Sequence, residues 1–209
     1  MSMVRTRRRR RKISPVKMAA AVLLAVLLAA VGMYYVGRYR EHMLYVQYPL
    51  RYKEQIVSCS REFGLEPWHV AAVIRCESSF RPDAVSSVGA RGLMQIMPDT
   101  GEWLAGKFDE EDVYSDDLLF SPETNIKYGC WFLKWLTVRY GGDRTLVTAA
   151  YHAGHGTVDG WLEDPEISPD GRTLASIPYA STRHYLEKIE RACGMYQELY
   201  DFSEGPGGA

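Results

Sequence analysis

The chain has 209 residues, 46% of them hydrophobic, which leaves room for one sizeable domain plus an appendage. Its net charge of −1 conceals an asymmetry: residues 1–40 carry ten Lys and Arg and no acid, whereas residues 41–209 carry 15 Lys and Arg against 26 Asp and Glu. The two parts are therefore expected to lie in different surroundings. The acidic part is not expected to bind an anionic polymer through its net charge.

The N-terminal 40 residues have the pattern of a membrane anchor. A basic segment at 1–17 contains the run RTRRRRRK and precedes twenty uncharged, mostly apolar residues at 18–37. Twenty helical residues at about 1.5 Å each span the ~30 Å hydrocarbon core of a bilayer. The positive charge on the N-terminal side predicts that this end is cytoplasmic and that the rest of the chain lies on the cell-wall side.

Two other interpretations of this region are open. A cleaved signal peptide has a shorter apolar stretch and a small-x-small exit, which LAAVGM at 28–33 matches poorly. The basic run alone resembles a nucleic-acid patch, but its position beside an apolar span favours an orientation signal and no nucleic-acid partner. We therefore expect a signal anchor at 18–37, a juxtamembrane stalk at 38–50, a folded domain at 51–200 and a flexible tail at 201–209.

The folded domain is predicted to be mainly α-helical, because apolar residues recur at helical spacing from Tyr52 onward. Gly64 suits the end of one helix and Pro67 the start of the next, which is expected to run to about Glu77. GARGLMQIM at 89–97 is compatible with a short β excursion. Further helices are predicted at 97–108, 121–142, 144–156 and 179–200, with polar loops at 78–92 and 164–176.

The cysteines provide no metal-binding pattern. Cys59, Cys76, Cys130 and Cys193 form no CxxC spacing. Each lies in an apolar helical pattern, where a cysteine often serves as a small hydrophobic residue, so free buried thiols are favoured over disulfides.

Glu77 is the residue whose position suggests chemistry. Val70, Val73 and Ile74 have the i, i+3, i+4 spacing of a buried helix face, and Glu77 is the next position on that face. Burial and a helix C-terminus both disfavour an ionised carboxylate, so the pKa of Glu77 is expected to rise, as a general acid requires. The structural alternative is that Glu77 turns outward and pairs with Arg75 or Arg81.

Three further blocks accompany the glutamate: ESSF at 77–80 is followed by SSVGARGLMQIMP at 86–98, AAYHAG at 149–154 and IPYASTRHYLEKI at 177–189. In this order they resemble the catalytic domain of the soluble-type lytic transglycosylases, the SLT family, which is related in fold to goose-type lysozyme. The resemblance covers about residues 45–200. It implies a lysozyme-like, mainly helical α+β fold, no cofactor, and cleavage of the MurNAc–GlcNAc bond of peptidoglycan glycan strands.

The resemblance implies a role for particular residues. Glu77 matches the catalytic acid. The remaining matches imply substrate-binding side chains, which are Ser86, Gln95, Met97, Tyr151, His152, Tyr179 and Tyr185. Met94 is interpreted as a core residue, and Gly89, Gly92 and Gly154 as positions where the backbone needs glycine.

The chain departs from the family pattern twice. His152 stands where the family has asparagine, and Ser181 where it has glutamate. The first puts one hydrogen bond to substrate in doubt, and the second removes an expected carboxylate. His152, His155 and Asp159 have a metal-like spacing, but the glycines between them and the family's lack of a catalytic metal argue against a metal site.

Most glycosidases use two carboxylates, and no second acid stands in a matching motif position. Asp83 is nearest in sequence and is interpreted as a turn residue. A single-acid transglycosylase giving 1,6-anhydroMurNAc ends is therefore favoured. The alternatives are a hydrolytic lysozyme-type muramidase and a catalytically weak wall-binding or assembly scaffold; no protein partner is indicated.

Overall fold

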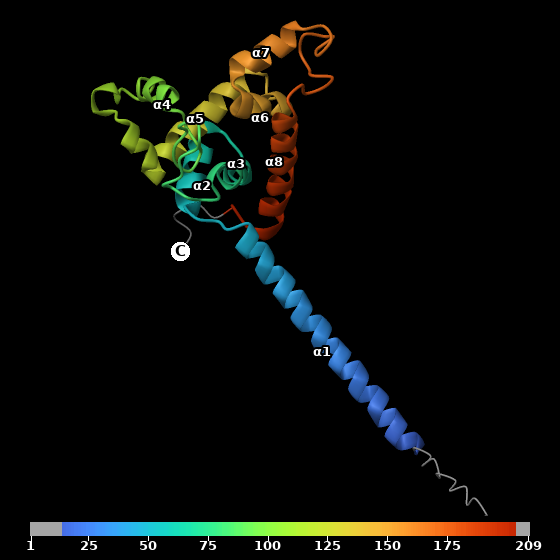
Figure 1. The fold of residues 1–209 in the computed structure, drawn as a ribbon. Coiled ribbons are helices and arrows are strands. Elements are labelled where there is room, and N and C mark those ends of the chain that lie inside the picture. Colours follow the sequence, from blue (N-terminus) through green and yellow to red (C-terminus); the bar gives the residue numbers. More distant parts are fainter. Residues whose placement is uncertain (1–13, 204–209) are drawn as a thin grey trace, which may run out of the picture. The chain divides into compact units, whose positions relative to one another are not determined.

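The computed structural model describes residues 14–203, so the predicted basic run at 5–12 and the last residues of the predicted tail lie outside the described residues. The chain divides into two compact units, Met1–Gln47 and Tyr48–Ala209 (Figure 1). The first unit contains α1 (Pro15–Gln47), and the second contains every other described helix.

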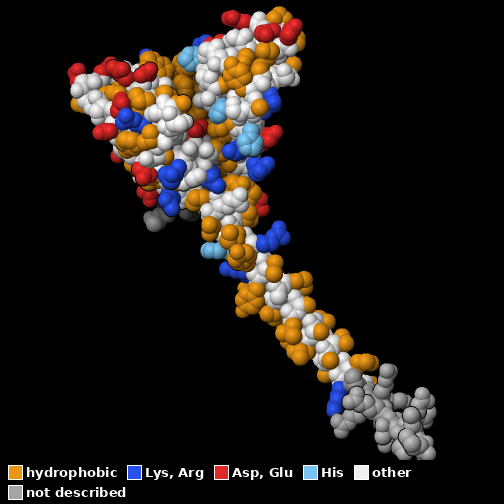
Figure 2. Space-filling model, in the orientation of Figure 1, with side chains coloured by type: hydrophobic (Ala, Val, Ile, Leu, Met, Phe, Trp, Pro, Cys, Tyr) orange, Lys and Arg blue, Asp and Glu red, His pale blue; other side chains and the backbone are white. Residues whose placement is uncertain are grey.

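Helix α1 is long and apolar. Its 33 residues extend beyond the predicted 18–37 span into the predicted stalk, because no proline occurs between Pro15 and Pro49. Hydrophobic side chains cover its visible face (Figure 2), and none of its residues is buried. Among the described residues, it alone has the length and hydropathy to cross a membrane, properties that a signal sequence shares.

The second unit is built from α-helices and two 3₁₀ turns, with long loops between α3 and α4 and between α7 and α8. Their order is α2 (Lys53–Phe63), α3 (Pro67–Ser78), α4 (Pro98–Ala105), the 3₁₀ turns η1 (Glu111–Val113) and η2 (Asp116–Phe120), α5 (Pro122–Arg139), α6 (Arg144–Ala153), α7 (His155–Glu163) and α8 (Ala180–Leu199). The predicted mainly helical class is confirmed. The expected β excursion is limited to two isolated antiparallel bridges, in which Arg91 pairs with Val85 and with Ile96.

Helix α3 lies at the centre of this unit. Its residues 70–74 are all buried, and α8 packs along it while α2 covers another side (Figure 1). Pro67 occupies the first turn, where its missing N–H costs no hydrogen bond. Gly64 ends α2 in the left-handed conformation (φ 66°), as its place in the sequence predicts.

Helix α5 holds the loop between α3 and α4. The side chain of Asn125 is fully buried and accepts a hydrogen bond from the Met94 N–H at 2.7 Å. Its amide group donates to the carbonyls of Arg91 and Leu119 at 3.0 and 2.8 Å. Gly92 (φ 77°) packs so closely that a Cβ there would lie 2.3 Å from the Asn125 amide nitrogen. The glycine is therefore required by packing inside the domain.

Two features differ from the sequence-based expectation. Helix α7 was not predicted: the expected helix at 144–156 runs through Gly154, whereas in the structure Gly154 (φ 86°) separates α6 from α7, which continues to Glu163. The four cysteines are free, but only Cys130 and Cys193 are buried, whereas Cys59 and Cys76 are half-buried. Met94 is fully buried, as expected of a core residue.

Candidate active site

Glu77 lies in the last turn of α3, one residue from its end. The next residue, Ser78, is buried, and its hydroxyl donates to the Leu93 carbonyl at 2.8 Å, which ties the helix end to the following loop. Ser79 and the buried Phe80 both have left-handed backbones, with φ of 53° and 61°. This conformation is unusual for side chains of this size and recurs at functional sites.

Tyr185 from α8 contacts Glu77 directly. Its hydroxyl donates to a Glu77 carboxylate oxygen at 2.5 Å, across 108 residues of sequence. Burial raises the pKa of Glu77 to about 7, and the hydrogen bond from Tyr185 opposes this rise. Arg75 and Arg81 are the residues with which an outward-turned Glu77 was expected to pair. Arg75 instead donates to the Ser79 hydroxyl, and Arg81 donates to the Ser78 carbonyl. Glu77 therefore has the environment of a carboxyl that carries a proton near neutral pH.

His152 packs against the ring of Tyr185, whose hydroxyl contacts Glu77. Its ring stacks on that of Tyr185 with centroids 4.6 Å apart, and its Nδ1 lies 3.2 Å from the hydroxyl of the buried Thr182. Burial and the nearby charge of Lys188 lower the pKa of His152. A neutral imidazole packs against the tyrosine without placing a positive charge near Glu77.

A pocket of about 400 Å³ is lined in part by His152, and Glu77 is connected to it through Tyr185, whose ring stacks on His152. It is lined by residues of the loop before α4, of α5 and of the α6–α7 junction, and it includes Gln95, Met97, Tyr151 and His152. Tyr151 donates its hydroxyl to the Met94 carbonyl at 2.8 Å, and burial followed by the charge of Glu77 raises its pKa. The lining combines apolar surface with hydroxyl, amide and imidazole groups, which suits an uncharged polar ligand.

Gln95 has its amide group fixed by the loop. Its Nε2 donates to the carbonyls of Ala84 and Gly92 at 3.2 and 3.0 Å, and its backbone is left-handed (φ 50°). The amide nitrogen is thus used within the protein, and the position of Gln95 in the pocket wall depends on this loop conformation.

The remaining two predicted site residues lie outside the lining of this pocket. The Ser86 hydroxyl oxygen accepts the Ala90 N–H at 2.9 Å within the loop, which leaves the hydroxyl proton able to donate. Tyr179 precedes α8, is 53% exposed, and packs edge-on against Trp161 at 5.1 Å. Neither residue contributes to the Glu77–Tyr185–His152 contact.

Among the described carboxyl groups whose pKa clearly departs from its ordinary value, Glu77 is the one whose pKa is raised. The lining of the pocket beside Tyr151 contains no Asp or Glu. No cluster of three metal-binding side chains occurs in the described part of the chain. Glu77 is therefore the described carboxyl group best suited to acid–base chemistry near neutral pH.

Comparison with known proteins places this chain in a family. The profile of the transglycosylase SLT domain matches residues 55–170. That match covers more than half of the chain. The chain belongs to the SLT domain family. The resemblance to the SLT family that the sequence motifs indicate is confirmed.

The chain is also similar to individual lytic transglycosylases. The chain is 34% identical over 154 residues to the soluble lytic murein transglycosylase of Salmonella typhimurium, covering 73% of this chain and 24% of that protein. It is 30% identical over 170 residues to the membrane-bound lytic murein transglycosylase C of Serratia proteamaculans, covering 70% of this chain and 47% of that protein. The chain therefore matches about a quarter to a half of the length of these relatives.

Solved SLT structures share the fold. The 70 kDa soluble lytic transglycosylase of Escherichia coli superposes with a TM-score of 0.68 at 31% identity, over 75% of this chain and 25% of that one. An inactive variant of the lytic transglycosylase Slt from Pseudomonas aeruginosa, with glutamine in place of a glutamate, has a TM-score of 0.65 at 32% identity, over 75% and 25% of the two chains.

The SLT domain of this chain contains supporting residues to which the sequence analysis gave no role, although two of them, Ser78 and Thr182, lie within the quoted motifs. Ser78 and Asn125 fix the loop that carries Gln95, and Thr182 contacts His152. No sequence signal marked Asn125, because two of its three hydrogen-bond partners, Met94 and Arg91, lie more than 30 residues away in the chain. Ser181, the second departure from the family pattern, is exposed in the first turn of α8.

Proposed function

We propose that this chain is a membrane-anchored lytic transglycosylase that cleaves the MurNAc–GlcNAc bond of peptidoglycan and leaves 1,6-anhydroMurNAc ends. The observation that carries the proposal is the position of Glu77, a buried carboxyl with a pKa of about 7 beside a polar and apolar pocket. Membership of the SLT family supports the substrate, because its named relatives are lytic murein transglycosylases.

In the first step, protonated Glu77 donates its proton to the departing glycosidic oxygen. A carboxyl whose pKa lies near 7 carries this proton at neutral pH and can release it without a large free-energy cost. The positive charge that develops at C1 of MurNAc is stabilised by the substrate's own N-acetyl group. A second protein carboxylate is then unnecessary at this step.

In the second step, Glu77 acts as the base. The carboxylate takes the proton of the C6 hydroxyl of the same MurNAc, and the C6 oxygen bonds to C1. This hydroxyl is tethered to the reacting sugar, so its effective concentration greatly exceeds that of water. Glu77 regains its proton and is ready for the next strand. Tyr185 holds the carboxylate in place through both steps by its hydrogen bond.

The remaining predicted site residues are proposed to position the glycan. Gln95, Met97, Tyr151 and His152 line the pocket, and we assign them to the sugars that flank the cleaved bond. Ser86 retains a hydroxyl proton that can donate to substrate, and Tyr179 offers an exposed ring. The last two are assigned to more distant parts of the strand.

Anchoring is proposed to occur through α1. Its apolar window has a mean hydropathy of 2.3, and the Lys and Arg of residues 1–17 should keep the N-terminus in the cytoplasm. The SLT domain would then face the cell wall. Alkaline carbonate extraction of membranes tests this point: the full-length chain should stay in the pellet, and its appearance as a shortened soluble protein would show that α1 is a cleaved signal.

The chemical form of the new MurNAc end distinguishes a lytic transglycosylase from a hydrolase. Digestion of purified peptidoglycan in ¹⁸O-labelled water should release muropeptides with 1,6-anhydroMurNAc ends, which are lighter than hydrolysis products by one water molecule and carry no label. The Glu77→Gln variant is the control and should release almost none. Labelled reducing-end MurNAc would identify a hydrolytic muramidase instead, and wild-type protein that binds strands without cleaving them would identify a scaffold.

A further inference from the structure

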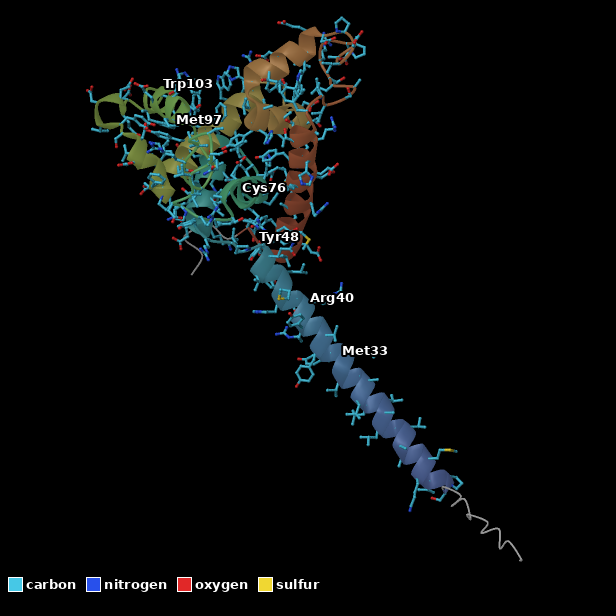
Figure 3. The ribbon with its side chains drawn as sticks, in the orientation of Figure 1. Met33, Arg40, Tyr48, Cys76, Met97 and Trp103 are labelled. Carbon is cyan, nitrogen blue, oxygen red and sulfur yellow. The ribbon has the colours of Figure 1, made fainter. Side chains whose placement is uncertain are left out.

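A chain of side-chain contacts leads from His152 to the acid. The His152 ring from α6 stacks on the Tyr185 ring from α8, with centroids 4.6 Å apart and planes inclined by 30°. The Tyr185 hydroxyl in turn donates to the Glu77 carboxylate of α3. Figure 3 marks Cys76, the residue before Glu77, where α3 faces α8. The contacts therefore connect three helices that meet at the acid.

A second contact fixes the imidazole on the tyrosine. The His152 Nδ1 lies 3.2 Å from the hydroxyl of Thr182, which is fully buried and precedes Tyr185 on α8 by nearly one helical turn. His152 is itself an exposed residue, so it contributes little to the hydrophobic core. Both of its fixed contacts are made to the helix that carries the hydroxyl bonded to Glu77.

The position of the Tyr185 hydroxyl depends on the packing of its ring. A tyrosine can turn its hydroxyl away from a carboxylate by rotating about its side-chain bonds, and neighbours packed on the ring restrict this rotation. The asparagine of the family pattern has no ring that could stack at this place. The departure to His152 therefore puts a flat ring on the tyrosine that bonds the acid.

We propose that His152 is a positioning residue for the acid: its ring, fixed by Thr182, keeps the Tyr185 hydroxyl on Glu77. The inference rests on the proposed function, which makes Glu77 the proton donor. The hydrogen bond from Tyr185 opposes the rise in the pKa of Glu77 that burial causes. Loss of the His152 ring should therefore let this pKa rise further, because Tyr185 is bonded to the carboxylate for less of the time.

The neighbours of the acid that could ionise have pKa values away from 7. Tyr151, Cys76 and Tyr185 interact electrostatically with the acid, and burial raises the pKa of each, that of Cys76 to about 11. Burial, followed by the nearby charge of Lys188, lowers the pKa of His152. A change in the titration of the acid above pH 6.5 therefore reports the hydrogen bond from Tyr185.

The test follows the titration of Glu77 without any substrate. The full-length chain in detergent is labelled with ¹³C at the glutamate side-chain carboxyl, NMR gives the midpoint, and Glu77→Gln identifies the resonance. His152→Ala should raise the midpoint by roughly 0.3 to 1 pH unit, a part of what a lost hydrogen bond to a charged group would give.

The same substitution in the Tyr185→Phe background separates the hydrogen bond from other effects. His152→Ala should give no further rise there, because the hydroxyl is already absent. The smaller side chain can also admit water to Glu77, which would lower the midpoint in both backgrounds. The difference between the two backgrounds therefore isolates the part of the change that acts through the Tyr185 hydroxyl.

Two further variants separate stacking from the loss of a histidine. His152→Phe keeps a ring on Tyr185 and should hold the midpoint near its wild-type value. His155→Ala removes another histidine of the pocket lining, whose ring contacts Trp135 at 5.1 Å. This control should leave the midpoint unchanged.

The outcomes separate this inference from the proposed function. Equal changes of the midpoint in the wild-type and Tyr185→Phe backgrounds overturn the positioning role, as does a shift in His152→Phe as large as that in His152→Ala. In cleavage assays, the alkaline limb of kcat/KM should move by the same amount as the midpoint. A protein that shows the midpoint shift but releases no 1,6-anhydro ends would refute the proposed reaction and leave the role of His152 intact.

Discussion

The raised pKa of Glu77 has a consequence for stability that can be measured without any substrate. In the unfolded chain this carboxyl titrates near 4.5, whereas burial in the folded protein raises its pKa to about 7. Between these pH values the folded state binds more protons than the unfolded state, so the free energy of unfolding falls as pH rises. The loss begins near the lower pKa and is complete above the higher one.

The size of the effect follows from the shift. A rise from 4.5 to about 7, at about 1.4 kcal/mol per pKa unit, corresponds to roughly 3 kcal/mol. Glu77→Gln keeps the shape of the side chain, and its amide oxygen still accepts the Tyr185 hydroxyl, but it cannot ionise. The variant should therefore match the wild type near pH 4 and exceed its free energy of unfolding by roughly 3 kcal/mol above about pH 8.

Urea unfolding followed by tryptophan fluorescence measures this difference. All five tryptophans lie within residues 48–209, so the signal reports the SLT domain even when the full-length chain is studied in detergent. Groups other than Glu77 contribute equally to both proteins and cancel in the difference. Glu198→Gln, at an exposed glutamate of α8, controls for the loss of one negative charge. A difference between wild type and Glu77→Gln that stays constant from pH 4 to 8.5 would refute a buried carboxyl of raised pKa.

Tyr185→Phe removes the hydrogen bond that lowers the pKa of Glu77. The alkaline limb of the pH–rate profile should therefore move above its wild-type position near pH 7. A limb that does not move would contradict this hydrogen bond. Gly92→Ala should lower the free energy of unfolding by about 3 kcal/mol or more, because a Cβ has no room at that left-handed position. Gly89→Ala, also left-handed but facing open space, should cost less in the same urea titration. External protease on spheroplasts should digest residues 41–209, and protection of the domain would overturn the proposed orientation.

The sequence alone was sufficient for features that depend on a single segment. A continuous apolar stretch shows that α1 has the length of a membrane span, and Gly64 and Pro67 mark the boundary between α2 and α3. The spacing of the apolar residues at 70–74 places Glu77 on the inward face of its helix. These signals are local, because helix periodicity and the conformations of glycine and proline depend on neighbouring residues.

The tertiary structure decided how separate segments meet. Tyr185 donates to Glu77 from 108 residues away, and Asn125 fixes a loop more than 30 residues before it. No local pattern encodes such contacts, since they depend on how α3, α5 and α8 pack. The same holds for the ring cluster of Trp103, Phe132 and Trp135: helical spacing indicated only that these residues lie on helices. Whether a ring is buried in the core or open to a ligand depends on the surfaces that fold over it.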